Sequence, residues 1–464
     1  MPERLYGVGM STRCRVRFTC AALALVLVCL QATTAAAAPT GTTTARGPGA
    51  VSYDISLRTG AGARWRGTES VTFTNTGAIP LHRIWLRLWG NGLSGCIAPL
   101  AVRVSGVRGG GAGGLAVGCT ALPVTLTRTL RPGERGTVSI DLAIDVPRRD
   151  DRFGRTGAYA TLGNALPILA VRDAGGWRLD PYSATGESFY SLAADWRLRL
   201  VHSSAVTVPV TGSSTSRRLA GGLVATTVVA RRVRDVAFAA GPYAVSRTTA
   251  PTGVVIRAWR PSEVSSAEAR DVLRKAGAVM AFYDKRFGRY PYPQLDIVLS
   301  RYRGGTFSGM EYPTLTLVSL DRQGVGPVEH ELAHQWWYGL VGDDEYAAPW
   351  LDESFAQYAS YEFMRDPASF CDPTFWPAPD ARVTSSMDYF DHHPGYGFTI
   401  YGNGLCALKD LQRTIGTSRM KRLMHDYAVT HRYGVSTTER FVAAAQRVSP
   451  VDLDPLWCRW RIDH

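Results

Sequence analysis

Short segments with alternating apolar and polar residues dominate the first half of the chain. Four clear examples are Tyr53–Leu57, Val71–Thr74, Ile84–Trp89 and Thr137–Leu142. Successive side chains of a β-strand point to opposite faces, so this alternation is typical of strands with one buried face. Turn-forming residues such as Pro132-Gly133 separate the segments. The pattern predicts an N-terminal antiparallel β-sandwich or saddle over residues 50–248.

The apolar period changes in the second half of the chain. Ser265 and Glu268 have the spacing of a helix capping box, and apolar residues then recur every three or four positions up to Tyr283. Strand-like and helix-like segments follow in mixed order, beginning with the predicted strand Leu295–Leu299. Residues 249–464 are therefore predicted to form an α+β domain, which makes the whole chain an α+β multidomain protein.

Residues 1–38 have the pattern of a secretory signal peptide. A basic start (Arg13, Arg15 and Arg17) precedes thirteen apolar or small residues, and small residues follow at 35–37. The apolar run is shorter than the roughly 20 residues that a membrane span needs. We expect cleavage, a flexible linker over residues 39–49, and a secreted protein with no stable membrane insertion. Association of the secreted protein with the cell envelope stays open. A leader retained as an anchor is the alternative.

The net charge of +13 does not indicate a nucleic-acid partner. The basic residues are mostly arginines scattered along the chain, and the densest group is Arg231, Arg232 and Arg234. A phosphate-binding surface would need a basic stripe on one face. We therefore expect no nucleic-acid binding, and the oligomeric state stays open.

The cysteines suit an oxidising compartment. Cys96 and Cys119 flank a Gly-rich loop at residues 109–114, and we predict a disulfide between them. The pairing of the later cysteines is left open: Cys371, Cys406 and Cys458.

The strongest chemical signal is His330-Glu331-Leu332-Ala333-His334, an H-E-x-x-H sequence. Residues four apart on a helix lie on the same face, so His330 and His334 can bind one metal ion. Glu331 then lies beside the metal as a general base. A catalytic zinc ion takes three protein ligands and leaves one position for water.

The third ligand should come soon afterwards from a second helix. The positions where a metzincin would have Gly and His hold Trp337 and Leu340, which favours a glutamate instead. Glu353 stands at the start of a helical segment, with its neighbour Asp352 as the alternative.

Three motifs, and their order along the chain, resemble those of the zinc aminopeptidases of the aminopeptidase N type, which are gluzincin metallopeptidases. Eighteen residues separate His334 from Glu353, as in that family, and this favours Glu353 over Asp352. Gly309-Met310-Glu311-Tyr312 resembles the family's G-x-M-E-N strand, and Tyr401-Gly402-Asn403-Gly404 resembles its Tyr-Glu-Lys-Gly segment. The departures at Tyr312 and at Gly402-Asn403 concern substrate preference more than chemistry.

The resemblance implies a thermolysin-like catalytic domain behind the β domain, in the two-domain form of exported bacterial members. It implies one zinc ion, and peptide substrates with a free N-terminus. Glu311, supported by Gly309 and Met310, would hold the substrate's amino group. Tyr401 would stabilise the transition state, with Tyr396 as a competing tyrosine.

Two alternatives to an aminopeptidase stay open. A zinc endopeptidase of the same domain type would need no anchor for an amino group, so Glu311 distinguishes the two. A catalytically inactive peptide-binding envelope protein would have no chemical need for Glu331.

Overall fold

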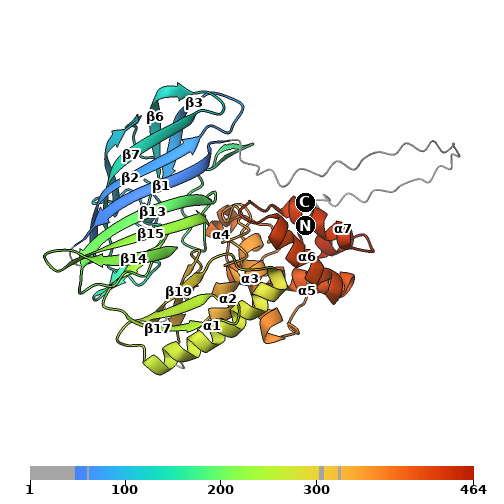
Figure 1. The fold of residues 1–464 in the computed structure, drawn as a ribbon. Helices are drawn as coiled ribbons and strands as arrows, with labels where there is room; N and C mark the ends of the chain where they lie inside the picture. The colour runs from blue at the N-terminus through green and yellow to red at the C-terminus, as the bar shows by residue number, and fades with distance from the viewer. Residues whose placement is uncertain (1–46, 60–61, 302–307, 322–325) are drawn as a thin grey trace, which may run out of the picture. The chain divides into compact units, whose positions relative to one another are not determined.

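The computed structural model describes residues 47–59, 62–301, 308–321 and 326–464. The predicted signal peptide and most of the predicted linker lie outside these residues. Strands fill the first part of the described chain and helices fill the last part, with a mixed region between them (Figure 1). The predicted succession of a β-rich part and an α+β part is therefore observed.

A seven-stranded sheet forms most of the N-terminal part. Figure 1 shows its middle strands side by side. Its order is β14 (Ser213–Arg218), β15 (Leu223–Val233), β13 (Ala194–Ser203), β1 (Gly49–Arg58), β2 (Arg64–Thr74), β7 (Arg135–Asp145) and β4 (Val102–Arg108). We expected only antiparallel pairs, but β1 and β13 run parallel. Those two strands are far apart in sequence, so alternation within each strand carries no information on their relative direction.

Smaller sheets and one short helical turn complete the β domain. The four-stranded sheet has the order β10 (Ile168–Leu169), β3 (Leu81–Arg87), β6 (Ala121–Leu130) and β5 (Gly110–Ala112). The others are β16 (Phe238–Ala240), β9 (Tyr159–Leu162) and β8 (Phe153–Thr156), then β11 (Arg172–Asp173) with β12 (Gly176–Trp177). The turn η1 (Trp89–Asn91) ends the alternating segment that the sequence placed at Ile84–Trp89.

A five-stranded sheet lies between two apolar cores. Its order is β17 (Ala244–Thr249), β18 (Val255–Arg260), β19 (Gln294–Arg301), β21 (Leu315–Leu320) and β20 (Gly309–Met310). Leu295 and Ile297 of β19 belong to the core shared with the helices, whereas Val298 belongs to the core of the β domain. A strand buried on both faces is mostly apolar, and the one buried charge of β19, Asp296, is paired with Arg257.

The helices cover one face of this sheet and continue to the C-terminus. The capping box at Ser265 and Glu268 is present at the start of the first helix. The helices are α1 (Ser266–Phe287), α2 (Val328–Ala333), α3 (Trp350–Met364), α4 (Met387–His392), η2 (Gly397–Asn403), α5 (Gly404–Ile415), α6 (Thr417–Thr430), α7 (Thr438–Val448) and α8 (Asp454–Arg459). None of the helices in the described parts is both long and apolar enough to cross a membrane.

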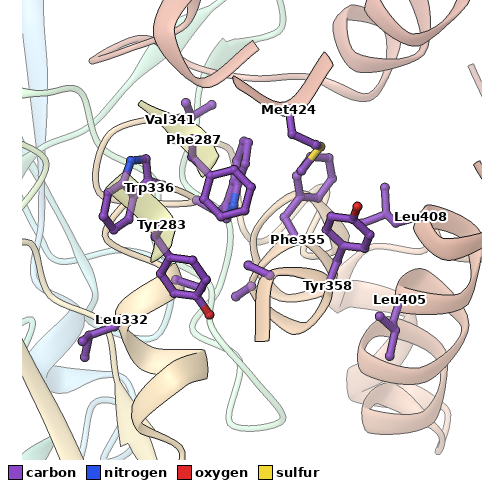
Figure 2. Close-up of a cluster of buried hydrophobic side chains, with 14 of the residues drawn as sticks. Tyr283, Phe287, Leu332, Trp336, Val341, Phe355, Tyr358, Leu405, Leu408 and Met424 are labelled. Carbon is purple, nitrogen blue, oxygen red and sulfur yellow. The ribbon is translucent and has the colours of Figure 1, made fainter. Parts of the chain in front are cut away.

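Aromatic side chains fix the helices that carry the site. Trp336 is fully buried, donates from its indole nitrogen to the Gly288 carbonyl at 2.7 Å, and lies with Tyr283 and Phe287 behind α2 (Figure 2). Phe355 on α3 belongs to the same core. This packing sets α2 and α3 rigidly against each other.

The two predicted cysteine partners are bonded, so the Cys96–Cys119 disulfide is confirmed. A second disulfide joins Cys371 to Cys406.

Candidate active site

The two histidines of the H-E-x-x-H sequence face each other one turn apart. His330 lies in α2, and His334 directly follows the helix in helical conformation. Their Nε2 atoms are 3.1 Å apart. Leu332, on the opposite side of α2, is buried in the core, so the helix has one apolar face and one face toward the site.

Glu353 on α3 completes a group of three metal-binding side chains. Its Oε2 lies 3.0 Å from His330 Nε2 and 3.4 Å from His334 Nε2. Ligand atoms bound about 2.0–2.1 Å from a tetrahedral zinc ion stand roughly 3.3 Å from one another. Two imidazoles and one carboxylate at these distances fit one zinc ion with a position left for water.

Asp352 lies on the other side of His334. One of its carboxylate oxygens accepts a hydrogen bond from His334 Nδ1, which also faces the Trp337 carbonyl at 3.1 Å. With Nδ1 protonated by these partners, Nε2 keeps its lone pair for the metal. This arrangement gives Asp352 the role of orienting His334 and leaves Glu353 as the third ligand.

Glu331 lies against the edge strand β20. A Cβ atom on Gly309 would come within 2.0 Å of Glu331 Oε1, so a larger residue at this position would have to displace the carboxyl group. The Glu331 carboxyl is buried, and its Oε2 has no hydrogen-bond partner among the residues that the structure describes. Burial raises the pKa of Glu331 well above its ordinary value, and nearby Glu353 adds to the effect.

Glu311 follows β20 and is also buried beside the metal ligands. Its Oε1 has no hydrogen-bond partner in the described ranges, and burial raises its pKa well above the usual value. Gln335, next to His334, donates to the Tyr312 carbonyl at 3.1 Å and so ties this strand end to the turn after α2. A buried carboxyl group with one oxygen free of partners among the described residues is suited to a cationic group of a ligand.

Tyr401 reaches the metal ligands from the other side. Its hydroxyl donates a short hydrogen bond to Glu353 Oε1, and its ring stacks on His330 with centroids 5.6 Å apart. Burial and the Glu353 charge raise the pKa of Tyr401 well above its ordinary value, so the hydroxyl keeps its proton. Tyr396 packs edge-on against Tyr401 and is itself buried.

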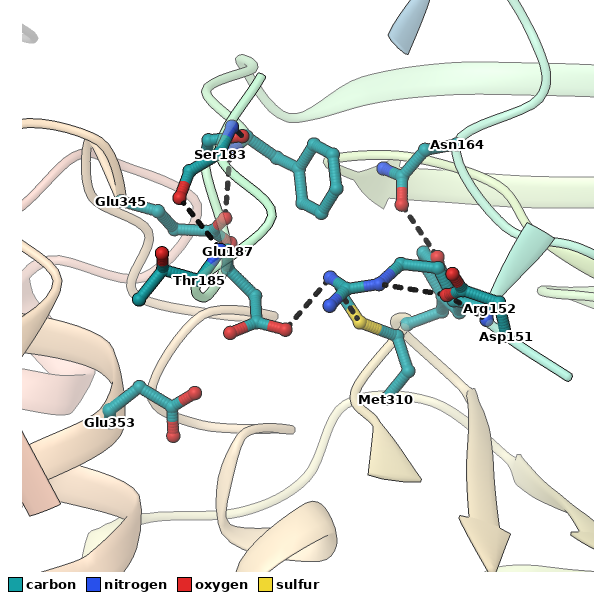
Figure 3. Close-up of polar contacts among 12 residues, drawn as sticks. Asp151, Arg152, Asn164, Ser183, Thr185, Glu187, Met310, Glu345 and Glu353 are labelled. Carbon is teal, nitrogen blue, oxygen red and sulfur yellow. Dashed lines mark hydrogen bonds and ion pairs between the residues drawn. The ribbon is translucent and has the colours of Figure 1, made fainter. Parts of the chain in front are cut away.

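The β domain contributes two charged residues that the sequence analysis missed. Arg152 donates to Glu187 at 2.7 Å and to the Met310 sulfur at 3.2 Å, and Figure 3 shows its guanidinium between the two. Burial raises the pKa of Glu187 to about 7 despite Arg152, with Glu353 and Asp352 as further causes. Glu187 lies in a segment without helix or strand, residues 178–193, and no periodicity distinguishes it there.

One cavity of about 580 Å³ is lined by the three proposed metal ligands and by Arg152, Glu187, Glu311, Glu331, Tyr396 and Tyr401. Its walls come from both parts of the chain: the loop around Glu187 on one side and the helices α2 and α3 on the other. Each residue proposed from the sequence lies at this cavity or directly beside it: Gly309, Met310, Glu311, His330, Glu331, His334, Glu353 and Tyr401.

Comparison with protein-family models decides the family of this region. Residues 272–460, which contain every one of those side chains, match the peptidase family M1 domain. This chain carries a peptidase family M1 domain. The family resemblance inferred from the three motifs is therefore confirmed.

Relatives of known activity resemble the M1 domain over a limited stretch. The chain is 30% identical to rabbit aminopeptidase N over 151 residues, which are 30% of this chain and 15% of the rabbit protein. It is 36% identical to mitochondrial aminopeptidase 2 of Saccharomyces cerevisiae over 218 residues, or 39% of this chain and 22% of the yeast protein. The chain thus spans a small part of the length of these relatives.

Solved structures match the M1 domain and the β domain together. The M1 zinc metallopeptidase of Deinococcus radiodurans has a TM-score of 0.66 at 20% identity, covering 90% of this chain and 94% of that one. The mutant of that enzyme bound to a Tyr-Ser-Ala substrate matches with a TM-score of 0.65 at 19% identity, over 89% of this chain and 94% of the other. This likeness confirms the predicted fold class of a β domain followed by an α+β peptidase domain.

Proposed function

We propose that this protein is a zinc-dependent aminopeptidase that hydrolyses the first peptide bond of peptides. The observation that carries the proposal is the buried carboxyl group of Glu311 beside the metal-binding triad, whose Oε1 has no hydrogen-bond partner among the described residues. A free α-ammonium would supply the positive partner that this carboxylate lacks. The aminopeptidases among its relatives, and the structures of the Deinococcus enzyme, support the same class of reaction.

The donor set of His330, His334 and Glu353 would hold the zinc ion. Bound there, zinc supplies a water molecule of lowered pKa and polarises the carbonyl of the scissile bond. Glu331, with its raised pKa, would accept the proton of that water and later deliver it to the leaving amine. Tyr401 would donate a hydrogen bond to the carbonyl oxygen as negative charge develops on it.

Glu311 and Glu187 would set the position of the substrate. The α-ammonium can donate to Glu311 and lie close to Glu187, whose charge Arg152 balances only on one side. An amino group held next to the metal site places the first peptide bond of the substrate over the metal. Cleavage there releases a single residue from the N-terminus. An endopeptidase of the same domain type has no use for such an anchor.

We also propose export of the protein to an oxidising compartment. The signal-peptide pattern of residues 1–38 is the main support. The Cys96–Cys119 and Cys371–Cys406 disulfides support it as well, since thiols stay reduced in the cytosol of most organisms. Detection of the protein in the cytosol with an intact leader would contradict this.

A screen of fluorogenic aminoacyl amides tests the proposed activity. We expect turnover that a chelator abolishes and that one equivalent of zinc restores. Glu331→Gln should bind the same amount of zinc and lose about a hundredfold or more in turnover, the usual scale for a general base. Turnover that survives both complete zinc removal and Glu331→Gln would overturn the proposal.

A further inference from the structure

The Tyr401 hydroxyl is carried by a helical turn of unusual geometry. Gly397–Asn403 (η2) is a π-helical turn, with wider spacing than the α-helix α5 that continues from it. Such turns are rare and frequently lie at functional sites, so the contacts that hold this turn bear on the position of Tyr401. One contact comes from α3, where Ser354 Oγ donates to the Ile400 carbonyl at 2.7 Å.

A second support comes from an irregular segment, residues 365–386, which contains no helix or strand. Asn403 Nδ2 donates to the Phe375 carbonyl at 3.2 Å, and the rings of Phe375 and Phe398 are 4.5 Å apart. Both rings remain about half exposed, at 53% and 45% of their surface. Packing alone therefore holds Phe375 weakly against the turn.

The segment is attached to the rest of the domain on both sides of Phe375. Beyond it, the Arg461 guanidinium lies over the Trp376 ring at 4.2 Å. Before it, Cys371 is bonded to Cys406, with Cα atoms 5.4 Å apart. Cys406 is buried on α5, three residues after the π-helical turn ends, so this bond ties the segment to the continuation of the turn itself.

We propose that the Cys371–Cys406 disulfide is a positioning device for Tyr401. It acts through Phe375, which it keeps within reach of Asn403 and Phe398. The inference rests on the proposed role of Tyr401 in catalysis. A looser turn would move the hydroxyl away from the developing oxyanion while leaving the metal ligands and Glu311 in place.

The test compares Cys371→Ser/Cys406→Ser with a matched control, Cys96→Ser/Cys119→Ser. The control removes the disulfide of the β domain, which joins no element that carries a metal ligand, Glu331 or Tyr401. We expect the first variant to lose about fivefold or more in kcat, with KM and zinc content within about twofold of wild type, because the lost contact acts mainly in the transition state. The control should keep the kcat of wild type. Equal kcat in wild type and Cys371→Ser/Cys406→Ser would overturn the inference.

Phe375→Ala provides a second route if the double variant folds poorly. It keeps the disulfide and should also lower kcat with KM unchanged. Phe370→Ala is its matched control, because Phe370 is 55% exposed in the same segment and contacts Tyr361 instead of the turn. An unchanged kcat for Phe375→Ala would contradict the proposed path.

Hydrogen exchange separates this inference from the proposed function. We expect faster amide exchange over Gly397–Asn403 in Cys371→Ser/Cys406→Ser than in either wild type or the control. An inactive wild-type protein would overturn the proposed function but would leave this difference measurable. Identical exchange in all three proteins would overturn the positioning role, whatever the activity.

Discussion

Two glycines at the cavity have side chains packed so closely against them that a Cβ atom would collide with these side chains. A Cβ atom on Gly309 would meet the Glu331 carboxylate at 2.0 Å, and one on Gly186 would meet the Tyr396 ring at 2.6 Å. Neither glycine has the positive φ angle that would require its backbone freedom. Each is needed for the space it leaves to a side chain of the site.

We predict that Gly309→Ala displaces Glu331 without removing the metal. The added methyl group would push the carboxylate away from the water-binding position, so kcat should fall by about tenfold to a hundredfold. Zinc content should be normal, because no ligand moves. Gly111→Ala is the matched control, since nothing lies within 4 Å of the added Cβ atom. Steady-state kinetics and metal analysis check both, and normal kcat in Gly309→Ala would contradict the packing argument.

Glu69 is a buried carboxyl group that has no part in the proposed reaction. It lies on β2 among the core-facing positions that include Val71 and Phe73. Neither of its oxygens has a hydrogen-bond partner in the described part of the chain. Burial raises the pKa of Glu69 well above its usual value.

This shift predicts a pH dependence of stability. The native state binds the Glu69 proton more tightly than the unfolded state, whose pKa is near 4.3. The stabilisation is complete below that pH and is lost as pH rises toward the folded pKa, at about 1.4 kcal/mol per pH unit. Glu69→Gln removes the titration, so its stability relative to wild type should increase between pH 5 and pH 8. Thermal unfolding across this range checks it, and a constant difference would show that Glu69 has an ordinary pKa.

At the scale of elements, the two histidine ligands could be predicted because His330 and His334 stand one helical turn apart. Glu353 lies in the first turn of the next helix, and its choice over Asp352 needed the spacing of the family. The chemistry of Glu331 follows from the local spacing of the two histidines. The roles of Glu311 and Tyr401 could be predicted only from the family resemblance. Each is a single residue, so neither belongs to a spaced pattern that would reveal its role.

Glu187 and Arg152 could not be predicted, because tertiary structure alone brings them together. The loop of Glu187 is fixed by contacts with distant residues: the Phe189 amide donates to Glu345 at 2.7 Å, and Ser183 Oγ donates to Asp391 at 2.6 Å. Those partners lie in the catalytic half of the chain, more than 150 positions away. No local pattern encodes such a contact.

We predict that Glu187→Gln weakens substrate binding more than turnover. The amide keeps the shape of the side chain but removes a negative charge next to the proposed ammonium site. KM should rise by about tenfold, equivalent to roughly 1.4 kcal/mol, while kcat changes little. Kinetics with a series of free peptides measures the two constants. A fall in kcat at constant KM would place Glu187 in the chemical step instead.

At the scale of the whole molecule, a buried arginine connects the β domain to the catalytic helices. Arg234 is 1% exposed and donates to the carbonyls of Tyr338 at 2.7 Å, Ser191 at 2.9 Å and Gly434. It belongs to the densest basic cluster of the sequence. The burial of this one arginine could not be predicted from the cluster, because tertiary packing alone decides which of its side chains is internal.

We predict that Arg234→Ala destabilises the protein by about 3 kcal/mol or more. The substitution leaves several buried carbonyl groups without donors and opens a cavity. Arg231→Ala is the matched control, because the Arg231 side chain is 73% exposed and pairs only loosely with Asp195, at 3.9 Å. It should change stability by less than about 0.5 kcal/mol. Denaturant unfolding compares the two, and equal stabilities would contradict the connecting role of Arg234.

The central claim is that Glu311 recognises a free amino terminus, and paired substrates test it most directly. One tripeptide is offered with a free and with an acetylated N-terminus to wild type and to Glu311→Gln, with zinc content measured in both proteins. We predict that wild type releases the first residue of the free peptide and cleaves the acetylated peptide at least about a hundredfold more slowly. Glu311→Gln should keep its zinc, show a raised KM for the free peptide and lose most of that preference. Cleavage of both peptides at similar rates by wild type, at internal bonds, would contradict the account and favour an endopeptidase.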